Sequence, residues 1–155
     1  MIFLGLGTNQ GNRPENLQAA ISRLGKQQVE ILRCSGVYLT PPWGVTNQPD
    51  FMNMVVEVQF PGSPLDLLYI ALEVEQLMGR IRKQKWGPRV IDIDLLEFNG
   101  QQLNHPDLIL PHPLYHKRDF VLNPLKELEP AFIPTGQRST VSQLADRLLA
   151  CDSSG

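Results

Sequence analysis

The stretch that most constrains this chain is Arg89–Leu96, RVIDIDLL, an apolar run that carries two aspartates. Such a run of Val, Ile and Leu is typical of a buried strand. Because side chains alternate along a strand, Asp92 and Asp94 share one face and the apolar side chains share the other. Their Cα atoms are then about 6–7 Å apart. Ionised and without partners in an apolar sheet, each carboxylate would cost several kcal/mol, so something must neutralise them.

An arginine salt bridge or divalent cations can neutralise such a pair. Two acids on one face of a strand suit one or two hard divalent cations best, and a solvated strand face is the plain alternative. The segment directly before the strand, residues 80–89, is strongly basic. Basic residues alone usually form a solvated surface. Beside a divalent site they are typical of ligands for a polyphosphate that shares the cations.

Composition predicts one ordinary globular domain of 155 residues. The net charge of −2 gives no reason to expect nucleic-acid or membrane binding. The two cysteines, Cys34 and Cys151, lack metal-ligand spacing and are expected to be free thiols. The first residues have neither a basic region nor a long apolar run, so we expect a cytoplasmic protein without a signal peptide or membrane span.

Periodicity and turn signals predict the elements in chain order. They are a central strand over 2–8, a helix over 13–25, a strand over 28–39 with a bulge near Ser35, a strand over 51–60, a helix over 64–79 capped by Ser63, and the strand over 89–96. A hairpin turn at Asn99-Gly100 follows, then a short apolar run over 108–110, helical turns within 114–128, a helix over 139–149 and a frayed end over 151–155.

The order β-α-β-β-α-β predicts an α+β, ferredoxin-like (split βαβ) fold with a C-terminal extension. Its antiparallel sheet would carry two helices on one face and leave the other for loops, ligands and the extension. The loop over 40–50 is long for a compact domain, which favours a functional role. His112 lies between two prolines and is therefore held in a rigid loop, although a lone histidine is more often structural than catalytic.

Several short motifs occur in a fixed order along the chain. The most specific joins Gly79-Arg80-Ile81-Arg82, Trp86-Gly87-Pro88-Arg89 and Ile91-Asp92-Ile93-Asp94-Leu95. The others are Leu6-Gly7-Thr8-Asn9, Tyr38-x-Thr40-Pro41-Pro42, Gln48-Pro49-Asp50-Phe51-x-Asn53, and Leu110-Pro111-His112-Pro113 followed by Arg118 and Phe120. Together, over residues 2–134, they resemble the 6-hydroxymethyl-7,8-dihydropterin pyrophosphokinase family, often called HPPK.

The resemblance implies a folate-pathway enzyme that moves the β,γ-pyrophosphoryl unit of ATP to the hydroxymethyl oxygen of a reduced pterin and releases AMP. It implies two Mg²⁺ ions, held by Asp92 and Asp94, and a monomer. Phosphoryl-type transfer needs positioning and charge neutralisation more than covalent chemistry, which agrees with paired acids beside a basic segment.

The resemblance also implies roles for individual residues. Arg80 and Arg89 match catalytic arginines that act on the phosphates. The expected ATP-binding residues are Glu75, Arg82, Trp86, His112 and Arg118, of which Arg82 and Trp86 match a lid that closes over the nucleotide. The expected pterin-binding residues are Thr40, Pro42, Phe51, Asn53 and Phe120, with the two phenyl rings stacked on the flat bicycle. The roles of Trp43 and Tyr115 stay open.

Two other function classes are compatible with parts of the sequence. An RNA-binding module of the same fold would use strand aromatics and the basic segment. The charge, the lack of an RNP-type pattern and two acids on a central strand argue against it. An ordinary kinase that releases ADP would carry a P-loop or a kinase motif set, and the sequence has neither.

Overall fold

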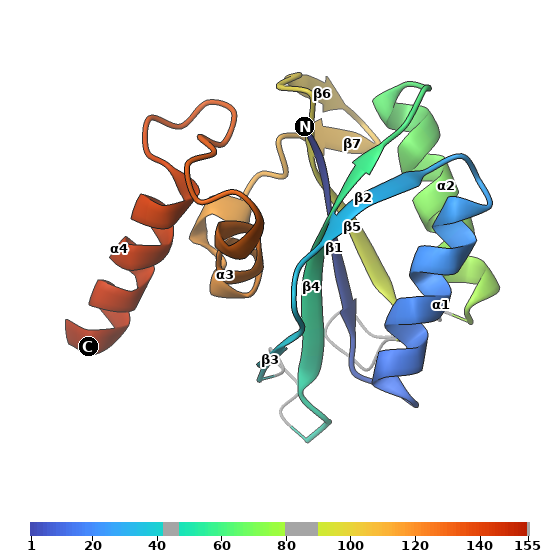
Figure 1. Cartoon of the computed structure of the whole chain (residues 1–155), viewed down its shortest axis with the longest axis horizontal. Helices are drawn as coiled ribbons and strands as arrows, with labels where there is room; N and C mark the ends of the chain where they lie inside the picture. Colours follow the sequence, from blue (N-terminus) through green and yellow to red (C-terminus); the bar gives the residue numbers. More distant parts are fainter. Residues whose placement is uncertain (42–46, 80–89, 155) are drawn as a thin grey trace.

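The computed structural model describes residues 1–41, 47–79 and 90–154, with side chains up to residue 150 (Figure 1). Its first part follows the order β1 (Ile2–Thr8), α1 (Arg13–Gly25), β2 (Glu30–Cys34), β3 (Tyr38–Thr40), β4 (Phe51–Gln59), α2 (Pro64–Leu77) and β5 (Asp92–Phe98). The rest is β6 (Leu103–His105), β7 (Leu108–Leu110), η1 (Tyr115–Lys117), α3 (Asp119–Leu128) and α4 (Val141–Ser154).

The main sheet has the strand order β2-β4-β1-β5, with all neighbours antiparallel and β1 in the interior. The short strand β3 pairs with β4 beyond the end of β2. Helices α1 and α2 cover one face of the sheet, and α3 and α4 lie on the opposite side (Figure 1). The predicted α+β, split βαβ arrangement is therefore confirmed, and so is the interior position of the first strand.

The predicted single strand over 28–39 is wrong, because two strands replace it. The interruption falls at Ser35, where a bulge was expected. The Ser35 hydroxyl accepts a hydrogen bond from the backbone N–H of Val55 at 2.9 Å, and the Ser35 N–H donates to the Val55 carbonyl oxygen at 2.9 Å. A side chain thus takes the place of a ladder hydrogen bond, and the chain leaves β2 before it resumes pairing as β3.

The strand predicted over 89–96 begins at Asp92 and ends at Phe98, and it lies at the edge of the sheet rather than in the centre. The turn at Asn99-Gly100 forms, with φ of 52° and 74°. The hairpin that this turn predicts does not form, since the next strand, β6, pairs with β7 in a separate small sheet rather than with β5. The last helix runs from Val141 to Ser154, and the expected fraying of the chain end stays a prediction.

Local capping explains where the first two helices begin. The Asn12 side chain accepts the N–H of Glu15 at the start of α1. Ser63 and Asp66 form a reciprocal capping box at the start of α2, as the predicted cap at Ser63 requires. Among the described residues, no helix is both long enough and apolar enough to cross a membrane.

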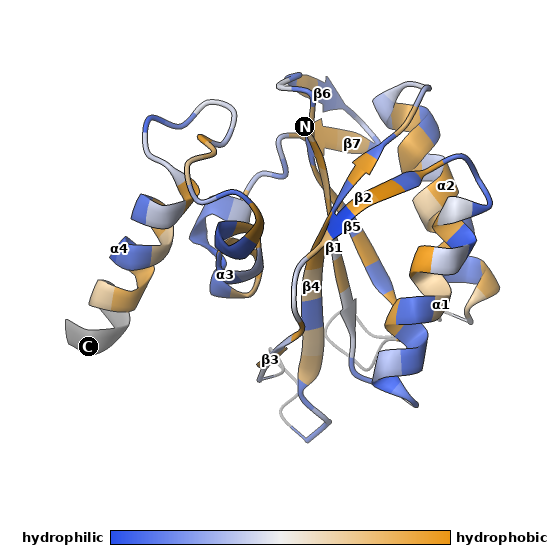
Figure 2. Cartoon of the chain, in the orientation of Figure 1, coloured by the Kyte–Doolittle hydropathy of each residue, from blue (hydrophilic) through white to orange (hydrophobic). Residues whose placement is uncertain are grey.

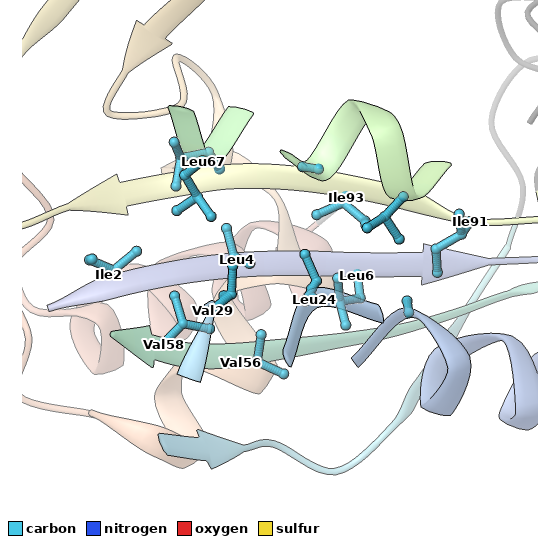
Figure 3. Packing of buried hydrophobic residues seen from close by; sticks show 14 of the residues in the cluster. Ile2, Leu4, Leu6, Leu24, Val29, Val56, Val58, Leu67, Ile91 and Ile93 are labelled. Atoms are coloured by element: carbon cyan, nitrogen blue, oxygen red, sulfur yellow. The ribbon is translucent and has the colours of Figure 1, made fainter. Parts of the chain in front are cut away.

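The hydrophobic core has two parts, one on each face of the sheet. Alternate residues of the strands, such as Leu4, Leu6 and Ile93, pack under α1 and α2 together with Leu24 and Leu67 (Figure 3). The strands are accordingly coloured as largely hydrophobic in Figure 2. The strand residues that point to the other face form the second part of the core: Phe3, Val55 and Leu96. They pack with Leu122 and Leu125 of α3 and Val141 of α4.

Burial along α2 leads to a stability prediction. Leu67 is fully buried, whereas Leu77 on the same helix is 58% exposed. Leu67→Ala should lower the free energy of unfolding by about 2–5 kcal/mol, because it leaves a cavity in the core. Leu77→Ala is the matched control and should change it by less than about 0.5 kcal/mol. Urea unfolding followed by circular dichroism measures both, and equal losses would contradict this packing.

Candidate active site

A row of residues that crosses three strands defines the candidate site. Gly7 on β1 pairs with Asp92 on β5 and with Asn53 on β4, and Gly5 pairs with Asp94. Paired residues on neighbouring strands project to the same face of a sheet. The two carboxylates and the Asn53 amide therefore share one face, and backbone without side chains lies between them. The predicted placement of both aspartates on one face is confirmed.

Helices α3 and α4 cover this same face of the sheet at the end of the strands that carries Phe3 and Val55. Phe3 and Val55 share it and are buried in the second core cluster. Asp92 and Asp94, at the other end of the strands, are half-buried. Apolar packing thus closes one end of the face and leaves polar groups accessible at the other.

Gly7 has a steric reason to be glycine. A Cβ atom at this position would lie 2.9 Å from the Oδ1 atom of Asn53, closer than real Cβ contacts allow. The amide nitrogen of Asn53 donates a 2.6 Å hydrogen bond to the hydroxyl of Thr40. The amide is therefore held with its nitrogen toward Thr40 and its oxygen over Gly7. Thr40 in turn pairs with Phe51 across β3 and β4.

The loop that joins β3 to β4 is anchored to the end of β1. The fully buried Asn9 donates from its amide to the Gln48 side chain at 2.8 Å and to the Pro49 carbonyl oxygen at 3.1 Å. Arg13 donates to the carbonyl oxygen of Asp50 at 2.9 Å. Asn9 was part of a motif in the sequence but had no predicted role, since asparagine after a strand is equally typical of a turn.

His112 and Arg118 lie close to Asp92. The His112 backbone N–H donates to the Leu96 carbonyl oxygen at 3.0 Å, which ties its loop to β5. The pKa of His112 is lowered to about 4, chiefly by burial of the ring. The positive charge of Arg118 lowers this pKa further and the negative charge of Asp92 raises it, so the three groups interact. His112 is therefore neutral at neutral pH.

Arg118 also contacts Phe120, with its guanidinium carbon 5.7 Å from the centre of the phenyl ring. This distance allows a cation–π interaction. Both residues flank the start of α3, where Arg118 is the residue before the helix. The imidazole Nδ1 atom of His112 is buried and has no hydrogen-bond partner among the residues that the structure describes. A cation, a π face and a buried nitrogen are thus grouped near Asp92.

Asp92 and Asp94 are the residues that could hold a metal. Within the described ranges, no group of three or more His, Cys, Asp or Glu side chains is placed to ligate an ion. Two carboxylates on one face, beside the bare backbone of Gly5 and Gly7, nevertheless fit the oxygen donors that Mg²⁺ takes, since Mg²⁺ is often bound by one or two carboxylates plus substrate phosphates.

The model of the 7,8-dihydro-6-hydroxymethylpterin-pyrophosphokinase (HPPK) family matches residues 3–130 of this sequence. The chain belongs to this family. A 2-amino-4-hydroxy-6-hydroxymethyldihydropteridine pyrophosphokinase from Methylorubrum extorquens is 40% identical over 136 residues, which cover 87% of this chain and 86% of the relative. The protein of the same name from Pseudomonas aeruginosa is 35% identical and covers 99% of this chain and 93% of its own length.

Solved structures agree with the fold. A crystal structure of an HPPK-DHPS protein in complex with substrates superposes with a TM-score of 0.79 at 15% identity, and Plasmodium falciparum HPPK-DHPS with pteroate gives 0.79 at 16%. Both matches cover 99% of this chain but only 44% and 43% of those longer chains. At this identity the likeness shows that the HPPK fold is shared and no more.

The structure settles where Tyr115 of this HPPK chain lies. Its ring is buried, and its hydroxyl donates to Glu97 on β5 at 2.5 Å. Glu97, also fully buried, accepts two more hydrogen bonds from Thr135, at 3.0 Å from the N–H and 2.6 Å from the hydroxyl. Burial and the bond to Glu97 raise the pKa of Tyr115. Tyr115 therefore anchors the loop between His112 and Arg118 to β5.

Glu75 reaches the same strand from α2. It is buried, and its Oε2 atom accepts the backbone N–H of Ile93 at 2.8 Å, between the two aspartates in sequence. The family resemblance implied that Glu75 lies near the nucleotide, which stays a prediction; the structure adds that Glu75 supports the outer edge of β5. Edge strands expose unpaired backbone groups, and a carboxylate is one way to satisfy them.

The described residues thus include eight of the predicted site residues beside Glu75. Five of them lie on β3, β4 and β5 and share the sheet face: Thr40, Phe51, Asn53, Asp92 and Asp94. The other three lie on the loop and helix that follow β7: His112, Arg118 and Phe120. Five predicted site residues lie outside the described residues: Pro42, Arg80, Arg82, Trp86 and Arg89. Trp43 does as well.

The proximity of His112, Arg118 and Asp92 predicts how the pKa of His112 changes in two variants of the metal-free chain. NMR titration of His112 should give a pKa near 4. Arg118→Met removes a positive neighbour and should raise it, and Asp92→Asn removes a negative neighbour and should lower it. Unchanged values in both variants would contradict the grouping.

The low pKa of His112 should also make the free energy of unfolding depend on pH. The unfolded chain protonates this histidine near pH 6.5 and the folded chain only near pH 4, so the unfolded state binds more protons between these values. The free energy of unfolding should therefore fall as the pH drops from about 6.5 to about 4. His112→Gln should lose less over this range.

Proposed function

We propose that this HPPK-family chain transfers the β,γ-pyrophosphoryl group of ATP to the hydroxymethyl oxygen of 6-hydroxymethyl-7,8-dihydropterin, in folate biosynthesis, through the residues grouped on the open sheet face. The observation that carries the proposal is the Asn53–Gly7–Asp92 row. It puts a hydrogen-bonding amide and a pair of carboxylates on one surface, with only backbone between them. A polar flat ligand and a metal-bound polyphosphate can then meet there.

The reaction makes one P–O bond and breaks another. The hydroxymethyl oxygen bonds to the β-phosphorus and releases its proton to solvent, the bond from the β-phosphorus to the oxygen shared with the α-phosphate breaks, and AMP leaves with that oxygen. Such a transfer depends on alignment of the two substrates and on neutralising the charge of the phosphates. Fixed positive groups do this without reorganising during the reaction.

Asp92 and Asp94 are proposed to hold Mg²⁺, and two ions are expected. When bound, the ions neutralise phosphate charge and align the polyphosphate. The two carboxylates have suitable oxygens and a shared face. The edge position of β5 is useful here, because the fixed backbone of β1 on one side and Glu75 on the other hold the strand that carries both ligands.

For the pterin, Phe51 and Phe120 are proposed to stack on the two faces of the bicycle. Asn53 and Thr40 are proposed to bind its polar edge, together with the backbone near Pro42. The mutual hydrogen bond of Asn53 and Thr40 restricts both side chains before the ligand arrives. Such preorganisation lowers the entropy cost of binding.

For ATP, Arg118 is proposed to contact the phosphates as a permanent cation, and Glu75 is proposed to lie near the nucleotide. His112, neutral because of its low pKa, would add a hydrogen bond rather than a second charge. Arg80 and Arg89 are proposed as the catalytic arginines, and Arg82 and Trp86 as the lid. A monomer and a cytoplasmic location also stay predictions.

Product analysis tests the proposed reaction. The chain is mixed with ATP, Mg²⁺ and 6-hydroxymethyl-7,8-dihydropterin, and nucleotides and pterins are separated by chromatography. AMP should form in step with the pterin diphosphate, and only when Mg²⁺ is present. ADP in place of AMP, or AMP without pterin diphosphate, would contradict the transfer chemistry.

The metal ligands give a prediction by substitution. Asp92→Asn and Asp94→Asn should each reduce kcat by at least about a hundredfold, because removal of a charge-stabilising group in a preorganised site costs on that order. Asp107→Asn is the matched control: this exposed aspartate accepts a hydrogen bond from the Tyr69 hydroxyl at 3.1 Å, has no proposed role in substrate binding, and should keep normal kcat. Thermal unfolding checks that all three variants fold, and normal kcat in either β5 variant would contradict the assignment.

A further inference from the structure

Glu127 on α3 uses both carboxylate oxygens to hold the segment that leads into β3. Its Oε2 atom accepts the backbone N–H of Gly36 at 2.8 Å, and its Oε1 atom accepts the hydroxyl of Tyr38 at 2.7 Å. These are charge-assisted bonds between parts of the chain about ninety residues apart in sequence. The predicted site includes neither Glu127 nor Gly36.

We propose that Glu127 is a positioning residue of the pterin site, which sets the spacing between α3, with Phe120, and the β3–β4 pair, with Phe51. The proposal rests on the proposed function, in which the two rings enclose the pterin. A flat ligand fits between two rings only at one separation, so whatever joins the two supporting elements controls binding. Glu127 is the side chain of α3 that bonds β3 directly.

The helix geometry connects Glu127 to Phe120. The two are seven residues apart, which is nearly two full turns, so they lie on the same side of α3 about 10 Å apart along its axis. Between them Leu122 and Leu125 are fully buried in the second core cluster. A helix packed this way transmits a change in docking at one end to the side chains at the other.

The strand geometry connects Tyr38 to Thr40. They are two residues apart on β3 and share a face, and they pair with Asn53 and Phe51 respectively. β3 has only three residues and, within the described part of the chain, pairs with β4 alone. A strand this short has few ladder bonds, so the two bonds to Glu127 are a large part of what fixes Thr40 against Asn53.

Gly36 is also adapted to this contact. A Cβ atom at this position would lie 3.3 Å from Oε1 of Glu127, which is tight enough to displace the carboxylate. The hydrogen bond to Glu127 raises the pKa of Tyr38, so its hydroxyl keeps the proton that it donates. Both details favour a permanent contact.

A neighbouring contact makes the test feasible. Arg33 on β2 donates to the Leu128 carbonyl oxygen at 2.8 Å and to Glu129 at 2.9 Å. It also pairs with Glu57 on β4 at 2.7 Å. The end of α3 therefore remains attached to the sheet when Glu127 is replaced, and such variants are expected to fold.

The experiment compares steady-state kinetics of Glu127→Ala with those of Lys126→Ala in the full chain. Glu127→Ala should raise the KM for 6-hydroxymethyl-7,8-dihydropterin about tenfold, the scale of losing a charge-assisted hydrogen bond, and leave the KM for ATP within twofold. Lys126, which bonds Asp146 on α4, is the matched control and should keep both values. Tyr38→Phe removes one of the two bonds and should give a smaller increase in the pterin KM.

A purely structural role would lower the melting temperature and leave both KM values unchanged, which would overturn the proposal. Equal increases in the two KM values would overturn it as well, because the effect would not be specific to the pterin. A wild-type chain that forms no AMP contradicts the proposed function instead. The positioning role alone fails if the wild type is active and Glu127→Ala has the kinetics of Lys126→Ala.

Discussion

The alternation of side chains along β1 and β5 is the constraint on which the structure depends. One face of the sheet must be apolar, because α1 and α2 bury it with Leu4, Leu6 and Ile93. Alternation then sends Asp92 and Asp94 to the other face. That face tolerates two carboxylates because glycines pair with them and because α3 and α4 cover only its far end. The two acids therefore lie where solvent and ligands can reach them, which is the position that the proposed cation site requires.

Hydrogen bonds between distant segments then arrange the groups around this face. Tyr115 and Thr135 meet at Glu97, which fixes the loop of His112 and Arg118 to the strand that carries the acids. Asn9 holds the β3–β4 loop, and Glu127 joins α3 to β3. Each anchor lies outside the residues proposed to touch substrate. Thr135 lies beyond the part that the HPPK family model matches, so the C-terminal segment also supports the site.

Local signals explain which parts of the fold were predictable. The strand Ile2–Thr8 and the helix Arg13–Gly25 have clear periodicity and terminal residues, and both have the predicted bounds. Local sequence indicated an irregularity near Ser35, but the full break between β2 and β3 depends on the distant partner Val55. The edge position of β5 depends on strand pairing over long sequence distances, which no local pattern indicates. Alternation correctly grouped the two aspartates. The family resemblance supplied the substrate roles, but motifs contain contact residues and not the anchors behind them, such as Glu127.

The central claim is that cations and ATP bind on the face of the sheet that carries Asp92 and Asp94. Paramagnetic relaxation tests this most directly: Mn²⁺ replaces Mg²⁺, a non-hydrolysable ATP analogue is added, and backbone amide signals are recorded by NMR. We expect selective broadening at Gly5, Gly7 and Asp92, with Leu24 under the opposite face much less affected. Strongest broadening on the side of α1 and α2, or none near β5, would contradict it.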